Sequence, residues 1–284
     1  MEKQFVLTGF ADEISADTTA QLEGLQKLGV THIEPRNIDG KNIIKLTDEE
    51  VAAFKAKLEK YGISVSSIGS PIGKIKITDD FDAHFEEFKR TVEIAKLLDT
   101  GYIRMFSFFY PKNTDVHTHR AAVLARLEIL LELAEKRGLT LCHENEKAIY
   151  GEAPEDCLDL MKHFDGRMKS VLDMGNFAFC QKDPMKGYEY LAPYIEYIHI
   201  KDAFYDTRIV PAGQGEGKVF EILSAYNKYT DKDTFLTMEP HLTVFDGLNK
   251  LSNMDDIKVQ NAYATPEEAF DAAVAALRGI LERI

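Results

Sequence analysis

The segment KRGLTLCHENE, residues 136–146, contains a helix end, a complete strand and the polar residues that follow it. Gly138 is typical of the position just past a helix, and the apolar run from Thr140 to Glu144 follows it directly. The same order of a glycine-containing stop and a strand recurs in LGVTHI (28–33), YGISV (61–65) and LLDTGYI (97–103). Helices that lead directly into a new strand are typical of a parallel sheet with crossover helices.

This alternation persists along the whole chain. Short apolar or β-branched runs alternate with longer segments that have apolar residues at helical spacing. The expected strands are Phe5 to Gly9, Thr31 to Glu34, Ile63 to Ile68, Tyr102 to Phe106, Thr140 to Glu144, Ser170 to Asp173, Tyr197 to Ile200 and Phe235 to Glu239. The expected helices are Thr18 to Leu28, Asp48 to Tyr61, Phe81 to Leu98, His119 to Arg137, Glu155 to His163, Met185 to Leu191, Phe220 to Tyr229 and Pro266 to Arg283. Eight such units predict an α/β fold of the (β/α)8 or TIM barrel type.

Two helix starts carry chemical signals that do not depend on periodicity. Thr47 with Glu50, and Thr265 with Glu268, form the capping-box pattern. Pro266 occupies the favoured first helical position. These signals support the expected helix boundaries.

A doubly wound open sheet is the alternative α/β architecture. It would carry a phosphate-binding fingerprint after its first strand, and the segment from Gly9 to Ile14 has none. No linker rich in Pro, Ser or Gly divides the chain, so we expect residues 1–284 to form one domain. The long irregular segment from Thr243 to Ala264 is expected to be functional or mobile.

The composition of the chain narrows the classes of function. With 284 residues, 45% of them hydrophobic, the chain can bury a sizeable core. Its 47 acidic residues outnumber 34 basic ones, and the formal net charge of −13 opposes nucleic-acid binding. No stretch approaches the roughly 20 apolar residues that cross a bilayer, and three cysteines without CxxC spacing fit a reducing compartment. We therefore expect a soluble cytoplasmic protein that binds neither nucleic acid nor membrane.

Catalytic groups of a TIM barrel lie at the C-terminal ends of its strands. Seven ionisable side chains would then share one rim, which a structural protein has no reason to desolvate. They are Glu34, Arg104, Glu144, Asp173, His199, Lys201 and Glu239.

Four of these residues predict a divalent metal site. Glu144, Asp173, His199 and Glu239 end the fifth to eighth strands, which are neighbours in the barrel. An oxygen-rich set with one imidazole favours Mn²⁺ or Mg²⁺ and does not exclude Zn²⁺ or Co²⁺. Glu146 is the competing ligand, because Glu144 and Glu146 would point to the same face if the strand extended. Glu146, however, already lies in the polar ENEK turn. We therefore favour Glu144.

Other polar segments near the rim allow more than one interpretation. His143 and His241 flank proposed ligands and fit either substrate contact or plain packing. AGQGEGKV, residues 212–219, lacks the Lys-Ser/Thr of a P-loop and is expected to be a flexible loop that lines the site. The basic side chains expected near the rim, available to an anionic group of the substrate, are Arg36, Arg104, Lys201 and Arg208.

These residues give the chain a resemblance to a known family. It resembles the sugar phosphate isomerase/epimerase group of xylose-isomerase-like barrels along nearly its whole length. HIKDA followed by AGQGEG is the most specific part of the match. The segments that carry it are IEPR (33–36), RMFSFF (104–109), HENEK (143–147), VLDMGN (171–176), HIKDA (199–203), PAGQGEG (211–217) and MEPH (238–241).

The resemblance implies a ligand set and one departure from it. In the family, Glu, Asp, His and Glu hold the metal, which corresponds to Glu144, Asp173, His199 and Glu239. Many members place a substrate-contacting His three residues after the metal-binding Asp. Here that residue is Asn176, which can hydrogen-bond a hydroxyl but cannot titrate.

The implied activity is metal-assisted movement of a proton at the carbon beside a carbonyl, as in a sugar isomerase or epimerase. The cation would polarise the carbonyl and hydroxyl oxygens, and Glu144 and Glu239 would act as bases on the two faces of an enediolate. The substrate would be a small sugar or sugar phosphate. The residues expected to contact it are Glu34, Arg36, Arg104, His143, Asn176, Lys201 and Gln214.

Three other functions compete with this interpretation. A DNA repair enzyme of the endonuclease IV type needs a trinuclear zinc cluster and a basic groove, which the charge and the number of ligands oppose. An inosose-type keto-polyol dehydratase would use a similar metal site and begin with the same proton abstraction. A sugar-binding barrel without activity is the third, because Asn176 replaces the titratable His. The identity of the sugar, its phosphorylation and homo-oligomer formation stay open.

Overall fold

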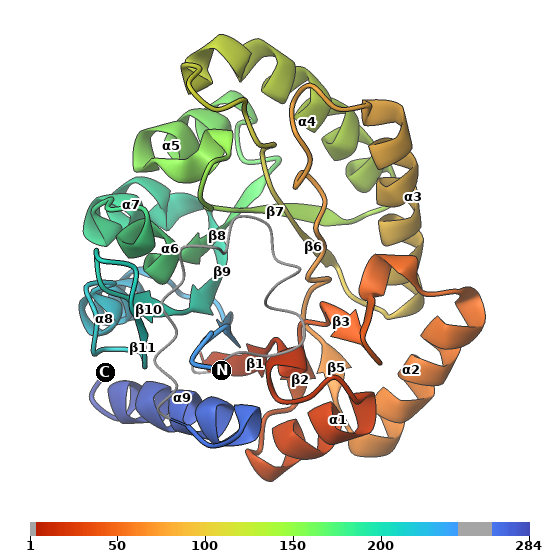
Figure 1. The fold of residues 1–284 in the computed structure, drawn as a ribbon, viewed down its shortest axis with the longest axis vertical. Helices are drawn as coiled ribbons and strands as arrows, with labels where there is room; N and C mark the ends of the chain where they lie inside the picture. Colours follow the sequence, from red (N-terminus) through yellow and green to blue (C-terminus); the bar gives the residue numbers. More distant parts are fainter. Residues whose placement is uncertain (1–3, 244–262) are drawn as a thin grey trace.

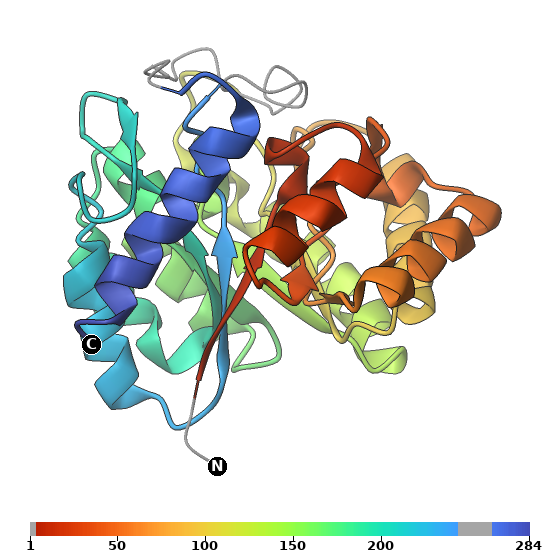
Figure 2. The ribbon, with the colours of Figure 1, turned by 90° about the horizontal axis from the view of Figure 1, so that it is seen from below.

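A six-stranded parallel sheet forms most of the inner wall of the molecule. The computed structural model describes residues 4–243 and 263–284. Helices surround the strands in Figure 1, and the C-terminal ends of the strands meet at one end of the barrel (Figure 2). In sheet order the strands are β1 (Phe5–Gly9), β12 (Thr234–Met238), β9 (Ile195–Ile200), β8 (Lys169–Asp173), β7 (Thr140–Glu144) and β6 (Tyr102–Met105).

Two short strands complete the barrel. The backbone N–H of Glu34 donates to the carbonyl of Gly9, the last residue of β1, at 3.1 Å, and the N–H of Ile68 donates to the carbonyl of Tyr102 in β6 at 3.0 Å. These bonds join the short pair to both edges of the six-stranded sheet, so the expected barrel is confirmed. The short strands are β2 (His32–Ile33) and β5 (Ser64–Val65).

Helices cover the outer face of the strands, and their bounds differ from the expected ones by at most two residues. Such differences are usual at helix ends. The helices are α1 (Thr18–Lys27), α2 (Asp48–Tyr61), α3 (Phe81–Leu97), α4 (Arg120–Lys136), α5 (Pro154–His163), α7 (Pro184–Leu191), α8 (Val219–Tyr229) and α9 (Pro266–Leu281).

The capping signals read from the sequence have their expected local chemistry at α2. The Thr47 side chain accepts from the Glu50 amide, and the Glu50 carboxylate accepts from the Thr47 amide. At α9 the Thr265 side chain accepts from the Glu268 amide, but the Glu268 carboxylate binds the amide of Ala264 instead. The capping box is therefore complete at α2 and shifted by one residue at α9.

Several short elements near the C-terminal rim were not expected from the sequence. They are too short to show a period. The Asp173 side chain begins the helix after β8 by accepting from the Asn176 amide at 2.7 Å. These elements are α6 (Met174–Phe179), the hairpin of β3 (Asn37–Ile38) and β4 (Lys41–Asn42), and the hairpin of β10 (Asp202–Ala203) and β11 (Ile209–Val210).

The first and last helices lie side by side and close the outer layer (Figures 1 and 2). Lys27 of α1 pairs with Glu267 at 2.8 Å and Asp271 at 3.0 Å, both in α9. Most of the segment from Thr243 to Ala264, expected to be functional or mobile, lies outside the described residues. Within the described ranges, no helix combines the length and apolar character needed to span a membrane.

Candidate metal centre

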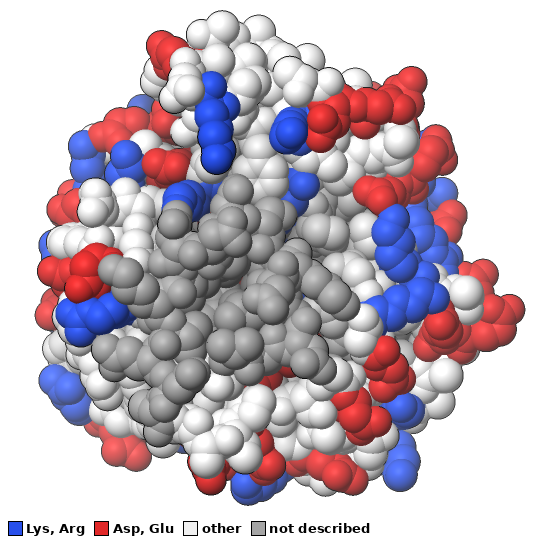
Figure 3. Space-filling model, in the orientation of Figure 1, with Lys and Arg blue, Asp and Glu red and all other residues white. Residues whose placement is uncertain are grey.

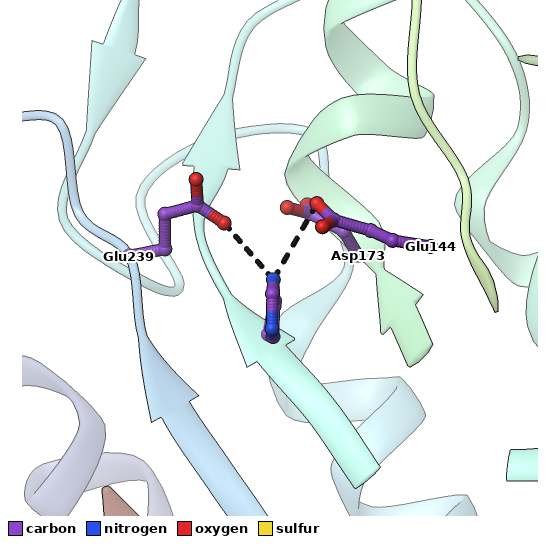
Figure 4. Close-up of side chains that lie close together, drawn as sticks. Glu144, Asp173 and Glu239 are labelled. Atoms are coloured by element: carbon purple, nitrogen blue, oxygen red, sulfur yellow. Dashed lines mark hydrogen bonds and ion pairs between the residues drawn. The ribbon is translucent and has the colours of Figure 1, made fainter. Parts of the chain in front are cut away.

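The four proposed ligands lie together at the C-terminal rim. Glu144 and Asp173 are the last residues of β7 and β8, His199 is next to last in β9, and Glu239 directly follows β12. All four are buried, and one ligand atom from each lies within 4.8 Å of the others. The three carboxylates converge in Figure 4. Parallel pairing brings the strand ends together: Asp173 lies opposite His199, while Glu144 and His199 lie opposite Val171 and Thr237, each two residues before the ligand of the next strand.

His199 is the centre of the cluster. Its Nδ1 lies 2.9 Å from Glu239 Oε2 and 3.4 Å from Glu144 Oε1. Its Nε2 lies 3.2 Å from Glu34 Oε2. Burial alone would lower the pKa of His199, but the carboxylates of Glu144 and Glu34 raise it well above its usual range. One imidazole nitrogen thus faces the two glutamates that would share a metal with it.

The carboxylates of the cluster are crowded and deeply buried. Burial raises the pKa of Asp173 to about 7, although Lys201 opposes the shift. Burial would also raise the pKa of Glu144, but His199 and Arg104 hold it at about 2. Three buried carboxylates and an imidazole suit a divalent cation, whose charge would offset the cost of placing them together. The donor set therefore fits the expected metal.

Lys201 and Asn176 connect the members of this cluster. The Lys201 Nζ lies 3.1 Å from Asp173 Oδ2 and 3.4 Å from Glu239 Oε2. It also donates to the Asn176 side-chain carbonyl at 3.1 Å. The Asn176 amide in turn donates to Glu144 Oε1 at 3.1 Å. Both side chains therefore contact the proposed ligands.

Two buried arginines hold the outer oxygens of the two glutamates. Arg104, at the rim end of β6, donates to Glu144 Oε2 at 3.1 Å. Arg36 donates to Glu239 Oε1 at 3.3 Å and makes two bonds to Asp12, at 2.9 and 3.1 Å. The outer oxygen of each glutamate thus contacts a guanidinium group.

Glu34 lies inside the barrel rather than at an open rim. Its carboxylate accepts from Tyr197 at 2.9 Å and Thr237 at 2.8 Å, and it contacts His199 Nε2. Those partners occupy both of its oxygens. This geometry makes Glu34 a partner of His199 and leaves its proposed substrate contact without structural support.

His143 and Glu146 lie outside the cluster. Neighbouring side chains of a strand point to opposite faces, and His143 Nε2 bonds the Ser107 hydroxyl at 2.9 Å and packs against Gly151. Burial lowers the pKa of His143 to about 4. Glu146 pairs with Lys74 at 2.9 Å. The geometry therefore favours packing for His143, and Glu144 over Glu146 as the candidate ligand.

The glycine-rich segment after β11 encloses a carboxylate of the protein itself. The amides of Gly213, Gly215 and Gly217 donate to the Asp202 side chain at 2.8 to 2.9 Å. A Cβ on Gly215 would lie 2.4 Å from Asp202 Oδ1. These bonds tie the segment expected to be a flexible loop to Asp202. Gln214, expected to contact substrate, is exposed within it.

Arg208 does not join the cluster in the described structure. Its guanidinium pairs with Asp206 at 2.8 Å and lies over the Phe204 ring. The hairpin of β10 and β11 was not expected, so its effect on Arg208 could not be anticipated. Of the four basic residues expected near the rim, Arg36, Arg104 and Lys201 contact the cluster.

A second group of possible ligands was missed. Atoms of Glu13, Glu239 and His241 also lie within 4.8 Å of one another. Arg36 contacts both glutamates of this group, at 3.3 Å each, and so already places a cation there. Glu13 follows the first strand by a few residues. Extending the strand-end criterion to the next turn would have identified it.

Comparisons with known proteins support the fold. A family model described as xylose isomerase-like TIM barrel matches residues 22–241, whereas no curated protein shows a significant match. One similar solved structure is the probable 3-DHS dehydratase AsbF from Bacillus anthracis (TM-score 0.74, 17% identity, covering 99% of this chain and 100% of that one). Another is D-allulose 3-epimerase from Methylomonas sp. in complex with D-allulose (TM-score 0.74, 18% identity, covering 99% of this chain and 98% of that one). The IolI protein with bound zinc is a third (TM-score 0.74, 17% identity, covering 100% of this chain and 99% of that one). At these identities the likeness shows the fold alone.

Proposed function

This chain belongs to the xylose isomerase-like TIM barrel family, and we propose that it is a metal-dependent isomerase or epimerase of a sugar or sugar phosphate. The observation that carries the proposal is the convergence of Glu144, Asp173, His199 and Glu239 within one buried cluster. Structural neighbours that include a sugar epimerase support an enzyme of this general kind.

We propose that these four side chains hold one divalent ion. Mn²⁺ is our first choice because three of the four donors are carboxylates, with Mg²⁺, Zn²⁺ and Co²⁺ as alternatives. A zinc ion in the structural neighbour IolI supports a divalent metal in general. When bound, the ion would polarise the carbonyl and hydroxyl oxygens of a sugar.

Glu144 and Glu239 are the proposed acid and base. Their carboxylates approach the same imidazole nitrogen, Nδ1 of His199, from two sides (Figure 4). Epimerisation needs a proton removed from one face of a planar enediolate and returned to the other, which two opposed groups can do. Isomerisation between adjacent carbons needs a single face. The arrangement therefore supports epimerisation more strongly.

Arg104, Lys201 and Asn176 are the proposed substrate-orienting residues. Among the described residues, the buried Arg104 Nε has no hydrogen-bond partner. A buried donor without a partner is costly, and a substrate oxygen would satisfy it. Lys201 and Asn176 contact the proposed ligands and so lie where substrate hydroxyls would be held.

A small-molecule substrate is favoured over nucleic acid by the surface as well as the site. Acidic and basic side chains intermingle along the margin of the rim face where it is described (Figure 3). Together with the net charge of −13 this mixture opposes a phosphate backbone as ligand. The three free cysteines support our proposal of a cytoplasmic location.

A keto-polyol dehydratase of the inosose type is the second candidate function. Its first step is the same proton abstraction, so Glu144 and Glu239 would serve it equally. A barrel that binds a sugar without turnover is the third, because Asn176 offers the Glu144 carboxylate a hydrogen bond and no titratable group.

The test combines metal analysis with a substrate screen. Purified protein loaded with Mn²⁺ would be incubated in D₂O with free and phosphorylated ketoses, and products followed by NMR. We expect one ion per chain and deuterium at the carbon that changes configuration. Loss of water from the substrate would identify the dehydratase. Metal binding without deuterium exchange would favour the sugar-binding protein without turnover. Absence of bound metal would contradict the proposal.

A further inference from the structure

Phe10 lies where the two arginines of the site meet. It directly follows β1 and is fully buried. The Cζ atoms of Arg36 and Arg104 lie 4.5 and 4.7 Å from the centre of its ring. The Phe10 ring also makes an edge-to-face contact with the His199 ring: the two ring centres are 5.2 Å apart and the interplanar angle is 87°. One phenyl ring therefore contacts two cationic side chains and the central imidazole of the cluster.

The two arginines connect this ring to the two proposed acid–base residues. Arg36 contacts Glu239 Oε1 and Arg104 contacts Glu144 Oε2. The other oxygen of each carboxylate faces His199 Nδ1. Each glutamate thus has one oxygen directed to the cluster and one held by a guanidinium group that packs on Phe10.

The surrounding chain fixes the ring and the arginines in place. Asp12 holds Arg36 through two hydrogen bonds. Gly69 lies against the ring, since a Cβ at that position would be 2.6 Å from Phe10 Cε1. Two guanidinium groups repel each other, whereas the face of an aromatic ring attracts each of them. The ring can therefore hold both arginines close to the site.

We propose that Phe10 is a positioning residue that, through Arg36 and Arg104, sets the separation of the Glu239 and Glu144 carboxylates. The proposal rests on the function proposed above, in which these carboxylates move the proton. A misplacement of about 1 Å in a reacting group can lower turnover by roughly 10²-fold. Phe10 acts on the carboxylates through the two arginines, and its ring also contacts His199, whose Nδ1 faces both carboxylates.

The test compares Phe10→Leu with Phe88→Leu. Phe88 is also fully buried, but it lies in α3 and packs against Phe85, so both variants lose an aromatic ring from the core. Crystal structures of the metal-free proteins would give the carboxylate positions, and EPR of bound Mn²⁺ would report the ligand geometry. We expect Phe10→Leu alone to move at least one of the two carboxylates, change the Mn²⁺ spectrum, and lower kcat by about 10- to 100-fold with little change in KM.

A second variant covers failure of Phe10→Leu to fold. Gly69→Ala keeps the ring but displaces it, and is expected to produce the same changes more weakly. Carboxylate positions and a Mn²⁺ spectrum equal to those of Phe88→Leu would overturn the proposal. If the parent protein turns over no sugar, the proposed function fails, while the crystal structures still decide the role of Phe10 without metal or substrate.

Discussion

The two arcs of the barrel wall are built differently. The long-ladder arc, β6 to β9 with β12 and β1, pairs over three or more residues at each contact and carries all four proposed ligands. The short-ladder arc, β2 and β5, pairs over two residues. There, side chains replace part of the backbone ladder: Ser66 bonds Thr8 at 2.8 Å and the carbonyl of Ile33 at 3.1 Å.

This difference separates the part of the barrel that carries the proposed metal ligands from the part that supports them. A continuous parallel ladder places strand-end residues at defined neighbouring positions, which a multidentate site requires. The short-ladder arc leads into loops that contribute Arg36, which bonds the Glu239 carboxylate at 3.3 Å, and Gly69, which packs against the Phe10 ring. We therefore expect changes in the long-ladder arc to affect metal binding and turnover, and changes in the short-ladder arc outside the loop positions of Arg36 and Gly69 to affect mainly stability.

The largest effect is expected from Glu144→Gln and Glu239→Gln in the long-ladder arc. Gln keeps an oxygen and nearly the same shape but removes the basic charge, so turnover should fall by about 10² to 10⁴-fold. Metal occupancy should fall less. Solvent deuterium exchange at the substrate carbon is the measurement. Exchange at the parent rate in both variants would exclude the two-glutamate mechanism.

His199→Ala should weaken metal binding by about 10²-fold or more, because it removes the only nitrogen donor of the candidate set. Titration calorimetry with Mn²⁺ gives the affinity. His143→Ala is the matched control, since His143 bonds Ser107 on the other face of β7. Equal affinities for His199→Ala and the parent would remove His199 from the site.

Gly73→Ala tests the loop after the short-ladder arc. Gly73 has a φ of +87°, and a Cβ there would lie 2.0 Å from the Phe106 carbonyl oxygen. We expect a loss of about 2 to 4 kcal/mol in the free energy of unfolding, measured with urea. Gly101→Ala is the control, because a Cβ there meets nothing within 4 Å. Similar losses in both variants would contradict the structure of this loop.

Ser66→Ala removes the side-chain bonds that supplement the short ladder. Loss of a buried hydrogen bond should lower the free energy of unfolding by about 1 to 2 kcal/mol. Mn²⁺ affinity should stay at the parent value. A tenfold loss of affinity would show that the two arcs are not separable in this way.

The smallest effect expected is a pH dependence of stability from His84. Its Nε2 accepts from the Gly73 amide at 2.8 Å and its Nδ1 contacts Glu87 at 2.9 Å. Burial lowers its pKa in the folded protein, although Glu87 opposes the shift, while Arg126 and Lys45 add to it. The unfolded chain therefore binds a proton more readily, and stability should fall as the pH drops through about 6.5.

The measurement for His84 is urea unfolding of the parent and His84→Gln between pH 5 and pH 8. The Gln variant cannot titrate at this position, so its stability should vary less over this range. A slope equal to that of the parent would assign the pH dependence to another group.

The order of strands and helices could be predicted because its signals are local. Gly138 and the apolar run after it specify a helix end and a strand without any distant residue. The short strands were less predictable. At Ser66 and Thr8 the decisive hydrogen bond joins residues from different units of the barrel, and no local pattern reveals it.

The candidate ligands could be proposed for the same reason, since a strand-end position follows from the local pattern of each unit. The role of these residues as metal ligands remains a prediction, but the structure does bring them together. Gln214 shows the limit of this reasoning. Three glycine amides of its loop donate to the Asp202 carboxylate and fix the conformation of the loop, and in that conformation Gln214 is exposed.

By itself, the sequence determined the barrel and the placement of three carboxylates and one imidazole at neighbouring strand ends. Both depend on periodicity and on residues within a few positions of each other. Only the tertiary structure decided which groups hold them: Arg104 at Glu144, Arg36 at Glu239, and Phe10 beneath both arginines. Arg104 and Glu144 come from the neighbouring strands β6 and β7, whereas the contacts of Phe10 and Arg36 bring together the ends of β1, β2, β6 and β12. The combined geometry therefore arises only when the barrel closes.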